Sequence, residues 1–218
     1  MHHMRPEPLP SIIRETEFDS RGFAVSEAGL LVPAYVGCQQ GFATRLNERL
    51  QGFYDRLREE AHVLPLCPFT ACAEYLDLET LNQLETRADE FRFWDTFNRH
   101  IGPVNYGTLM PYSKMMIADL DGSHGVDDGL SAEIAHYATR YMGSRPLVGI
   151  RSDVRLAENL AAPINPAVRY FLDQGPYNGL FFQGPFAEDE ALEAIAGMAE
   201  KMIVSFSGRD GSEIPGAW

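Results

Sequence analysis

Basic residues are scarce in this chain of 218 residues. Its 18 lysines and arginines stand against 31 aspartates and glutamates, so the formal net charge is −13. A charge of that sign repels the phosphates of nucleic acids and of anionic lipids, and the sequence contains no cluster of basic residues to offset it. The composition therefore argues against a nucleic acid polymer or a membrane as a partner.

Cysteines and long apolar runs are scarce as well. Cys38, Cys67 and Cys72 are too few and too irregularly spaced for a disulfide framework or a zinc site, which favours a reducing compartment. No apolar run reaches the length of a membrane-spanning helix, and polar residues and prolines stand where a signal peptide needs an apolar core. We therefore expect a cytoplasmic protein.

Apolar residues make up 45% of the chain, which at this length suits one substantial core. Residues 1–29 show no clear periodicity and are expected to form an N-terminal arm of uncertain order, either a short hairpin or partly disordered, to which we assign no chemistry. Residues 30–206 are expected to form a single α/β domain, followed by an irregular C-terminal tail over residues 207–218.

Strand-like and helix-like segments alternate along residues 30–206. Short apolar runs predict strands, whereas apolar residues that recur every three or four positions predict amphipathic helices. This alternation is typical of a flavodoxin-like or Rossmann-like open sheet of about five parallel strands with helices on both faces. The predicted strands are 30–38, 62–66, 115–120, 146–150 and 179–183, and the predicted helices lie near 44–60, 77–100, 131–142, 165–173 and 188–205.

Acidic residues crowd the end of the third predicted strand, where ligands bind in such sheets. Asp119, Asp121, Asp127 and Asp128 lie in one loop, which leads into a helix that carries Glu133. Carboxylates so close together raise one another's pKa, a cost that is tolerated more often at active sites than elsewhere. We expect Glu133 in the first turn of its helix, where backbone N–H groups favour the ionised form and suit it to act as a nucleophile.

Turn formation and helix capping explain some of these acids without any function. A calcium-binding loop is rejected, because the twelfth position counted from Asp119 is Leu130, where such a loop needs a glutamate. Asp119, Asp121 and Gly122 resemble the nucleophile motif of haloacid-dehalogenase-type phosphatases. Ser123 stands where that family has a threonine, and no later strand ends in the paired acids that hold magnesium, so a phosphatase is kept only as an alternative.

A larger pattern resembles the nucleoside 2-deoxyribosyltransferase family and its relatives, the nucleotide N-glycosidases. This family has an aspartate six residues before a nucleophilic glutamate, with a glycine between them, and Asp127, Gly129 and Glu133 meet that spacing. Tyr35 and Gly37 match the residues that end the family's first strand, where the tyrosine hydroxyl orients the nucleophile. Together the matches cover about residues 33–171.

The resemblance implies that the protein cleaves the N-glycosidic bond of 2′-deoxynucleosides through a covalent ester on Glu133 and passes the sugar to another nucleobase, without a metal or a cofactor. Tyr35 and Asp127 are the other implied catalytic residues. Nucleosides and free nucleobases are then the partners, and the protein is a homo-oligomer with sites shared between subunits. The implied substrate-binding residues are Gly37, Phe42, Asn105, Asp119, Gly129 and Asn165, of which Asn165 reaches the sugar of a neighbouring subunit's substrate.

One residue of the family pattern is missing. Members commonly carry an aspartate before the third strand that protonates the leaving base, whereas this chain offers Asn105 or Tyr106 there. An amide is a poor proton donor, so either Asn105 only orients the base or the proton comes from another group. The carboxyl candidates are Asp95, Asp119 and Asp121.

Other functions stay open at this point. The loop 37–41 lacks the hydroxyls and cations that bind a 5′-phosphate, so neutral nucleosides are favoured over nucleotides. Transfer to water instead of a base would make the protein a nucleoside or nucleotide N-glycosidase, and the same fold also supports a non-enzymatic nucleotide-binding sensor. Some family members place a terminal carboxylate in an active site, a role that would fall to Trp218.

Overall fold

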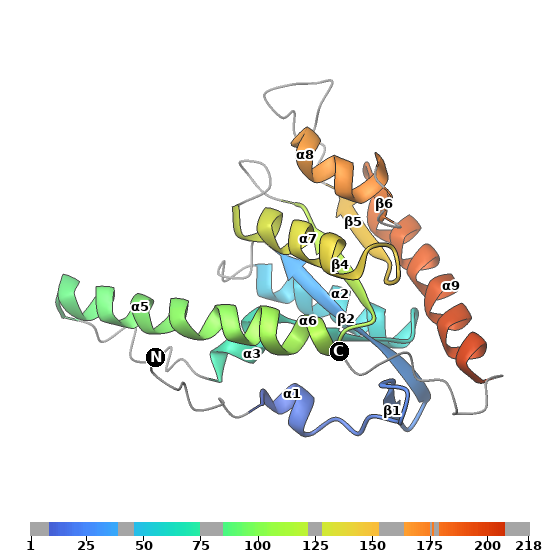
Figure 1. Ribbon diagram of the computed structural model, residues 1–218, viewed down its shortest axis with the longest axis horizontal. Helices are drawn as coiled ribbons and strands as arrows, with labels where there is room; N and C mark the ends of the chain where they lie inside the picture. Colours follow the sequence, from blue (N-terminus) through green and yellow to red (C-terminus); the bar gives the residue numbers. More distant parts are fainter. Residues whose placement is uncertain are drawn as a thin grey trace.

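A mostly parallel sheet lies at the centre of the structure (Figure 1). This computed structural model describes residues 9–38, 46–74, 85–121, 128–152, 164–174, 176 and 179–207. The strands are β1 (Ala24–Ser26), β2 (Gly29–Cys38), β3 (Val63–Leu66), β4 (Met115–Asp119), β5 (Leu147–Arg151) and β6 (Gly179–Gln183).

Five of these strands are parallel and lie in the order β3-β2-β4-β5-β6, while the short β1 runs antiparallel to the start of β2. This order is flavodoxin-like and confirms the predicted open α/β sheet. From β2 the chain moves to β3 on one side and then returns to β4 on the other side. The strand order therefore reverses between β2 and β4, and open α/β sheets bind ligands at such a switch point.

Helices cover both faces of the sheet (Figure 1). On one face lie α2 (Leu46–Glu59) and α9 (Ala187–Ser207). On the other lie α7 (Asp128–Tyr141) and a continuous helical segment made of α5 (Arg87–Val104), the π-helix η1 (Asn105–Leu109) and α6 (Met110–Tyr112). Short helices complete the described segments: α1 (Ser11–Arg14), α3 (Pro68–Ala73), α8 (Pro166–Arg169) and the π-helix η2 (Tyr170–Gln174).

Strand side chains alternate between two cores, one on each face of the sheet. In β2, Tyr35 belongs to the core under α7, whereas Cys38 belongs to the core under α2 and α9. In β4, Ala118 lies in the first core and Ile117 in the second. Residues before β2 contribute as well, with Ile13 buried in the first core and Phe23 in the second.

The predicted strands agree with the observed ones to within one residue at each end. The largest difference follows His100, where the sequence pattern predicted no further helix. Residues 77–84 of that predicted helix lie outside the described residues, but its C-terminal part continues through Pro103 into η1 and α6. Proline removes a backbone N–H and usually ends a helix, whereas here the chain continues as a π-helix, a form found mostly as short insertions in α-helices.

None of the described helices has both the length and the hydropathy needed to cross a bilayer.

Candidate active site

Glu133 lies on α7, above the carboxyl ends of β2 and β4, where the strand order reverses. The prediction that it occupies the first turn of its helix is wrong. α7 begins at Asp128, so Asp128 is the first-turn acid and Glu133 lies in the second turn. There its own helix supplies no unpaired N–H groups, and other elements must hold the carboxylate.

Two elements, η1 and β2, contact the half-buried Glu133 carboxylate. From η1, the Asn105 amide Nδ2 donates a hydrogen bond of 2.9 Å to Glu133 Oε1. From β2, Gly37 lies so close that a Cβ on it would stand 3.1 Å from Glu133 Oε2 and 2.6 Å from Leu130 Cδ1. Glycine is therefore the residue that lets α7 approach the end of β2. A hydrogen bond to a carboxylate is charge-assisted, so Asn105 stabilises the ionised form.

Tyr35 lies fully buried on the same face of β2 as Gly37. Burial raises the pKa of its hydroxyl well above the usual range, and the Glu133 carboxylate raises it further. The hydroxyl and the carboxylate are therefore close, although Tyr35 makes no hydrogen bond of regular geometry with the described residues. The hydroxyl stays protonated at neutral pH and can act only as a hydrogen-bond donor to an anion.

Tyr106 is a second phenol beside Glu133. Burial raises the pKa of its hydroxyl, and Glu133 again contributes. Its ring makes an edge-to-face contact with the ring of His136, one helical turn after Glu133, at a centroid distance of 4.9 Å. Sequence reasoning named Tyr106 only as an alternative to Asn105, because nothing in the pattern showed that both lie on a π-helix facing α7.

Asp119 lies on the opposite face of the sheet from Glu133, in the core under α2 and α9. Cys38 Sγ donates to its Oδ2 at 3.7 Å, and Arg49 Nη2 from α2 lies 3.7 Å away. Burial raises the pKa of Asp119 to about 6, while Arg49 and the backbone N–H of Asp121 oppose that rise. Asp119 and Glu133 belong to the same sequence motif, but side-chain alternation in β4 separates them.

Arg49 lies among three carboxylates at the carboxyl edge of the sheet. Its Nη2 is 2.9 Å from Asp121, 3.7 Å from Asp119 and 3.6 Å from Glu188 of α9. The Ser152 hydroxyl also donates to Asp121, which joins the ends of β4 and β5. The Arg49 guanidinium is thus the cation that these carboxylates share. Within the described residues, no three histidine, cysteine or acidic side chains are grouped to hold a metal.

Arg151 is a buried cation that sequence reasoning overlooked. It ends the apolar strand β5, is only 3% exposed, and shares a face with Leu147, which belongs to the core under α7. Its Nε and Nη1 have no hydrogen-bond partner within the described segments. The sequence feature that could have identified Arg151 is its position as a charged residue at the carboxyl end of an apolar strand, because ligands bind at these ends in open α/β sheets.

The other predicted site residues are not brought to Glu133 by any described contact. Gly129 is exposed in the first turn of α7. Asn165 is also exposed, and its Oδ1 accepts the Ala167 N–H at 2.9 Å as the N-cap of α8. Phe42, Asp127 and Trp218 lie outside the described residues.

No protein-family model and no curated protein matches this chain. Among solved structures, it resembles a conserved protein from Enterococcus faecalis V583 with a TM-score of 0.48 and 16% identity, over 77% of this chain and 99% of the other. It also resembles a 2-deoxyribosyltransferase from Leishmania mexicana with a TM-score of 0.43 and 16% identity, over 76% of this chain and 97% of the other. These are likenesses of fold.

Proposed function

We propose that this protein is a nucleoside 2-deoxyribosyltransferase that cleaves the N-glycosidic bond of a 2′-deoxynucleoside and transfers the sugar to another nucleobase. The observation that supports this most is the Glu133 carboxylate, which the Asn105 amide holds at 2.9 Å beside Gly37 and Tyr35 at the switch point of the sheet. A carboxylate fixed in this way suits nucleophilic attack on an anomeric carbon.

The reaction proceeds by double displacement at C1′. Glu133 attacks C1′ as the bond to the base nitrogen breaks, through a state with oxocarbenium character, and a sugar ester on Glu133 results. The base leaves with the bonding electron pair and takes up a proton. A second base then attacks C1′ on the face that the first base left and gives up its N–H proton to the group that protonated the first base, while Glu133 departs as a carboxylate. Two inversions retain the anomeric configuration.

Tyr106 is the group that we assign to the leaving base. Asp119 faces the other side of the sheet, and the Asn105 amide already donates to Glu133. The Tyr106 hydroxyl is protonated at neutral pH, and its electrostatic interaction with Glu133 indicates that it lies near that carboxylate. Asn105 Oδ1, which is buried and without a hydrogen-bond partner among the described residues, can accept a hydrogen bond from the substrate.

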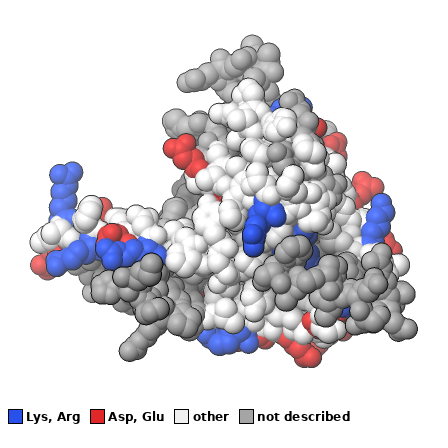
Figure 2. Space-filling view, viewed as in Figure 1, with Lys and Arg blue, Asp and Glu red and all other residues white. Residues whose placement is uncertain are grey.

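The remaining assignments follow the sequence resemblance. Asp127 binds the sugar hydroxyls, Phe42 stacks on the base, and Asn165 of a neighbouring subunit completes the sugar site. Asn165 is exposed, and the N-cap of α8 uses only its Oδ1, so its Nδ2 can donate to the sugar of a neighbouring subunit's substrate. Figure 2 shows a mostly uncharged face around basic side chains that lie near its centre.

A nucleotide N-glycosidase is the second candidate, and Arg151 favours it. A buried guanidinium whose Nε and Nη1 lack partners among the described residues can hold a 5′-phosphate at the carboxyl edge of the sheet. In that case 2′-deoxynucleoside 5′-monophosphates are cleaved faster than deoxynucleosides, and Arg151→Gln removes the preference.

Product analysis separates these functions. The protein is incubated with thymidine and adenine, and the products are separated by chromatography. We expect deoxyadenosine and thymine from the wild type and neither from Glu133→Ala, while Glu200→Gln, an exposed change on α9, behaves as wild type. Thymine without deoxyadenosine indicates a hydrolase. Neither product from the wild type, with nucleoside still bound by Glu133→Ala, indicates a sensor and contradicts the proposal.

A further inference from the structure

The strand β6 forms one edge of the sheet. It pairs with β5 on one side, and no described strand lies on its other side (Figure 1). None of its five residues is fully buried, and Leu180 is 40% exposed. The helix α9 packs across β2, β5 and β6, so it covers a face of the sheet while the residues of β6 stay partly exposed.

One hydrogen bond shows which backbone groups of β6 point away from β5. The Gly184 N–H donates to the Arg151 carbonyl oxygen of β5 at 3.0 Å. Because successive residues of a strand direct their N–H and C=O groups to opposite sides, Phe182 faces β5 as Gly184 does, whereas Phe181 and Gln183 face outward. No described strand pairs with these outward groups. Such an edge is a template for another strand.

The opposite edge of the parallel strands is protected. There β3 contains Pro65, and all four of its residues are buried. Proline and charged side chains are common devices that keep an edge strand from pairing with another chain. Because β6 carries neither a proline nor a charged residue, it is the edge that can accept a further strand.

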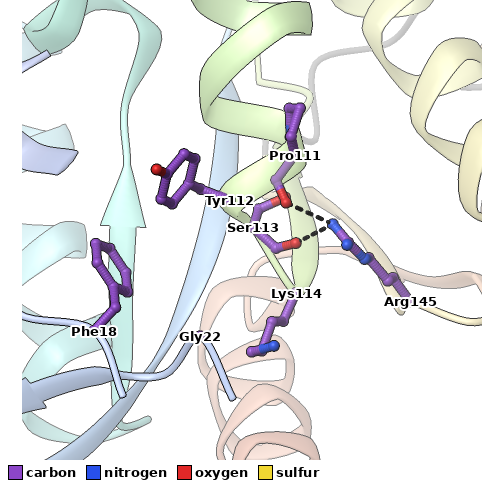
Figure 3. Close-up of a pocket in the computed structure, with 7 residues that line it drawn as sticks. All are labelled: Phe18, Gly22, Pro111, Tyr112, Ser113, Lys114 and Arg145. Atoms are coloured by element: carbon purple, nitrogen blue, oxygen red, sulfur yellow. Dashed lines mark hydrogen bonds between the residues drawn. The ribbon is translucent and has the colours of Figure 1, made fainter. Parts of the chain in front are cut away.

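A cavity of about 260 Å³ near the start of β5 gives a contrast to this edge (Figure 3). Arg145 lies in its wall, and its Nη1 donates to the carbonyl oxygens of Pro111 at 3.3 Å and of Ser113. The guanidinium also stacks on the Tyr141 ring at 3.9 Å. Contacts within the chain thus occupy this guanidinium, whereas no described contact occupies the outer side of β6.

Charge decides which partner suits the β6 edge. Two copies that each carry a formal net charge of −13 repel each other, so they can meet only where charges are absent or neutralised. Residues 174–187 contain no charged side chain and no histidine. The carboxylates that border this segment are paired within the chain, Asp173 with Arg169 at 2.7 Å and Glu188 with Arg56 at 3.1 Å. A second copy of the chain can therefore approach this edge closely.

We propose that β6 of one copy pairs with β6 of a second copy, antiparallel and about a two-fold axis at Phe181, so that one sheet continues through both subunits. Two residues opposite each other in such a pair exchange both of their backbone hydrogen bonds. The outward groups of Phe181 then meet those of the partner subunit's Phe181, and Gly179 meets Gln183 of the partner subunit. Phe186, which is 67% exposed just after β6, adds apolar area beside the strand.

This interface is distinct from the one proposed to share active sites. Antiparallel pairing directs the carboxyl ends of the two sheets in opposite directions, so it does not bring Asn165 of one copy to Glu133 of the other. The inference therefore does not depend on the reaction proposed for Glu133.

Sedimentation velocity of the full chain over a range of concentrations tests this pairing. Gln183→Pro removes an outward N–H but none of the groups that bond to β5, a change that edge strands tolerate. We expect it to weaken association by about tenfold or more, so that its assembly has half the wild-type mass at concentrations between the two dissociation constants. Gln183→Ala keeps the N–H and should assemble as the wild type does.

A charge variant keeps the test decisive if Gln183→Pro fails to fold. Leu180→Lys places two like charges near the two-fold axis, and we expect it to weaken association as well. Val25→Lys makes the same kind of change at a strand residue of similar exposure, 42% against 40%, but on β1. This control should associate as the wild type does.

Hydrogen exchange then locates the interface. The amides of β6 should exchange more slowly in the assembled wild type than in Leu180→Lys, while those of β3 exchange alike in both. The proposal is overturned if the wild type is a monomer at every concentration, which would leave this edge to a strand of another protein. It is also overturned if folded Gln183→Pro and Leu180→Lys associate as the wild type does, or if the β6 amides exchange equally fast in the wild type and in Leu180→Lys.

Discussion

The amide of Asn105 fixes the Glu133 carboxylate, and this contact gives a pH-dependent test. We expect Asn105→Asp to raise the pKa of Glu133, because a like charge beside a carboxylate disfavours its ionisation. The acidic limb of kcat/KM against pH should then move to higher pH. Asn105→Ala should lower kcat and move the limb in the same direction but less far, because it removes the hydrogen bond to the ionised carboxylate without adding a charge. Coinciding acidic limbs for the wild type and Asn105→Asp would show that the two side chains do not interact under the assay conditions.

Tyr106 should matter for its hydroxyl and not for its ring. Tyr106→Phe keeps the ring contact with His136 but removes the proposed donor to the leaving base, and we expect kcat to fall by roughly 10- to 100-fold. The loss should be smaller for substrates whose base leaves easily without a proton. Tyr170→Phe, at an exposed tyrosine, is the control. If both variants match the wild type, the base is protonated by another group.

Gly37 allows α7 to approach β2, so a methyl group there should displace the nucleophile. A Cβ would stand 2.6 Å from Leu130 Cδ1 and 3.1 Å from Glu133 Oε2. We expect Gly37→Ala to lower stability by about 1–3 kcal/mol in urea unfolding and to reduce kcat as well. Gly52→Ala on α2, where a Cβ meets nothing within 4 Å, should be neutral or slightly stabilising. Equal stability and activity in the two variants would refute this role of Gly37.

Among the secondary-structure elements, the strands could be predicted from sequence and the helix around Asn105 could not. Strands buried on both faces read as continuous apolar runs, as in residues 115–118, so their positions followed directly. The segment after His100 contains Pro103 and Pro111, which favour a loop reading. Packing against α7 and the sheet outweighs that local preference. The assignment of Asn105 to the site therefore rested on the family resemblance alone. Its hydrogen bond to Glu133 is seen only in the structure.

The acidic loop shows a second limit of sequence reasoning. Asp119 and Glu133 belong to one motif, and the sequence grouped them in one site. Their placement depends on which way side chains point at the end of β4, and the strand's alternation directs Asp119 towards α2 and α9. The start of α7 three residues earlier than predicted likewise moved Glu133 out of the first turn. The direction of side chains at the end of a strand and the first residue of a helix thus decide which acidic side chains lie close together.

Asp119 of β4 is buried near Arg49 of α2, and its raised pKa predicts how the stability of the protein depends on pH. Its pKa is raised from 3.8 to about 6, so the folded protein binds this proton more tightly than the unfolded chain does. Stability from this group is therefore present below pH ~4 and is lost as the pH rises through ~6. Asp119→Asn should be more stable than the wild type above that range, by roughly 1–3 kcal/mol. Urea unfolding from pH 4 to 8 measures this, and a pH-independent difference would refute it.

At the scale of the whole molecule, the proposal that subunits share their sites can be tested by mixing two variants. If Asn165 completes the neighbour's site, a mixed oligomer of Glu133→Ala and Asn165→Ala contains sites with both native residues. We expect the mixture to recover activity that neither variant has alone. Activity no greater than the sum of the separate variants, after subunit exchange is verified, would place Asn165 outside the site.

The covalent intermediate on Glu133 is the centre of the proposed mechanism, and intact-mass measurement detects it directly. The protein is mixed with a 2′-deoxynucleoside in excess, quenched in acid during turnover, and analysed whole and after proteolysis. We expect a mass gain of one deoxyribosyl group on the peptide that contains Glu133. Glu133→Ala should show no adduct and a loss of turnover of at least about a thousandfold. Turnover by the wild type with no adduct, together with an active Glu133→Ala variant, would contradict the assignment of Glu133 as the nucleophile.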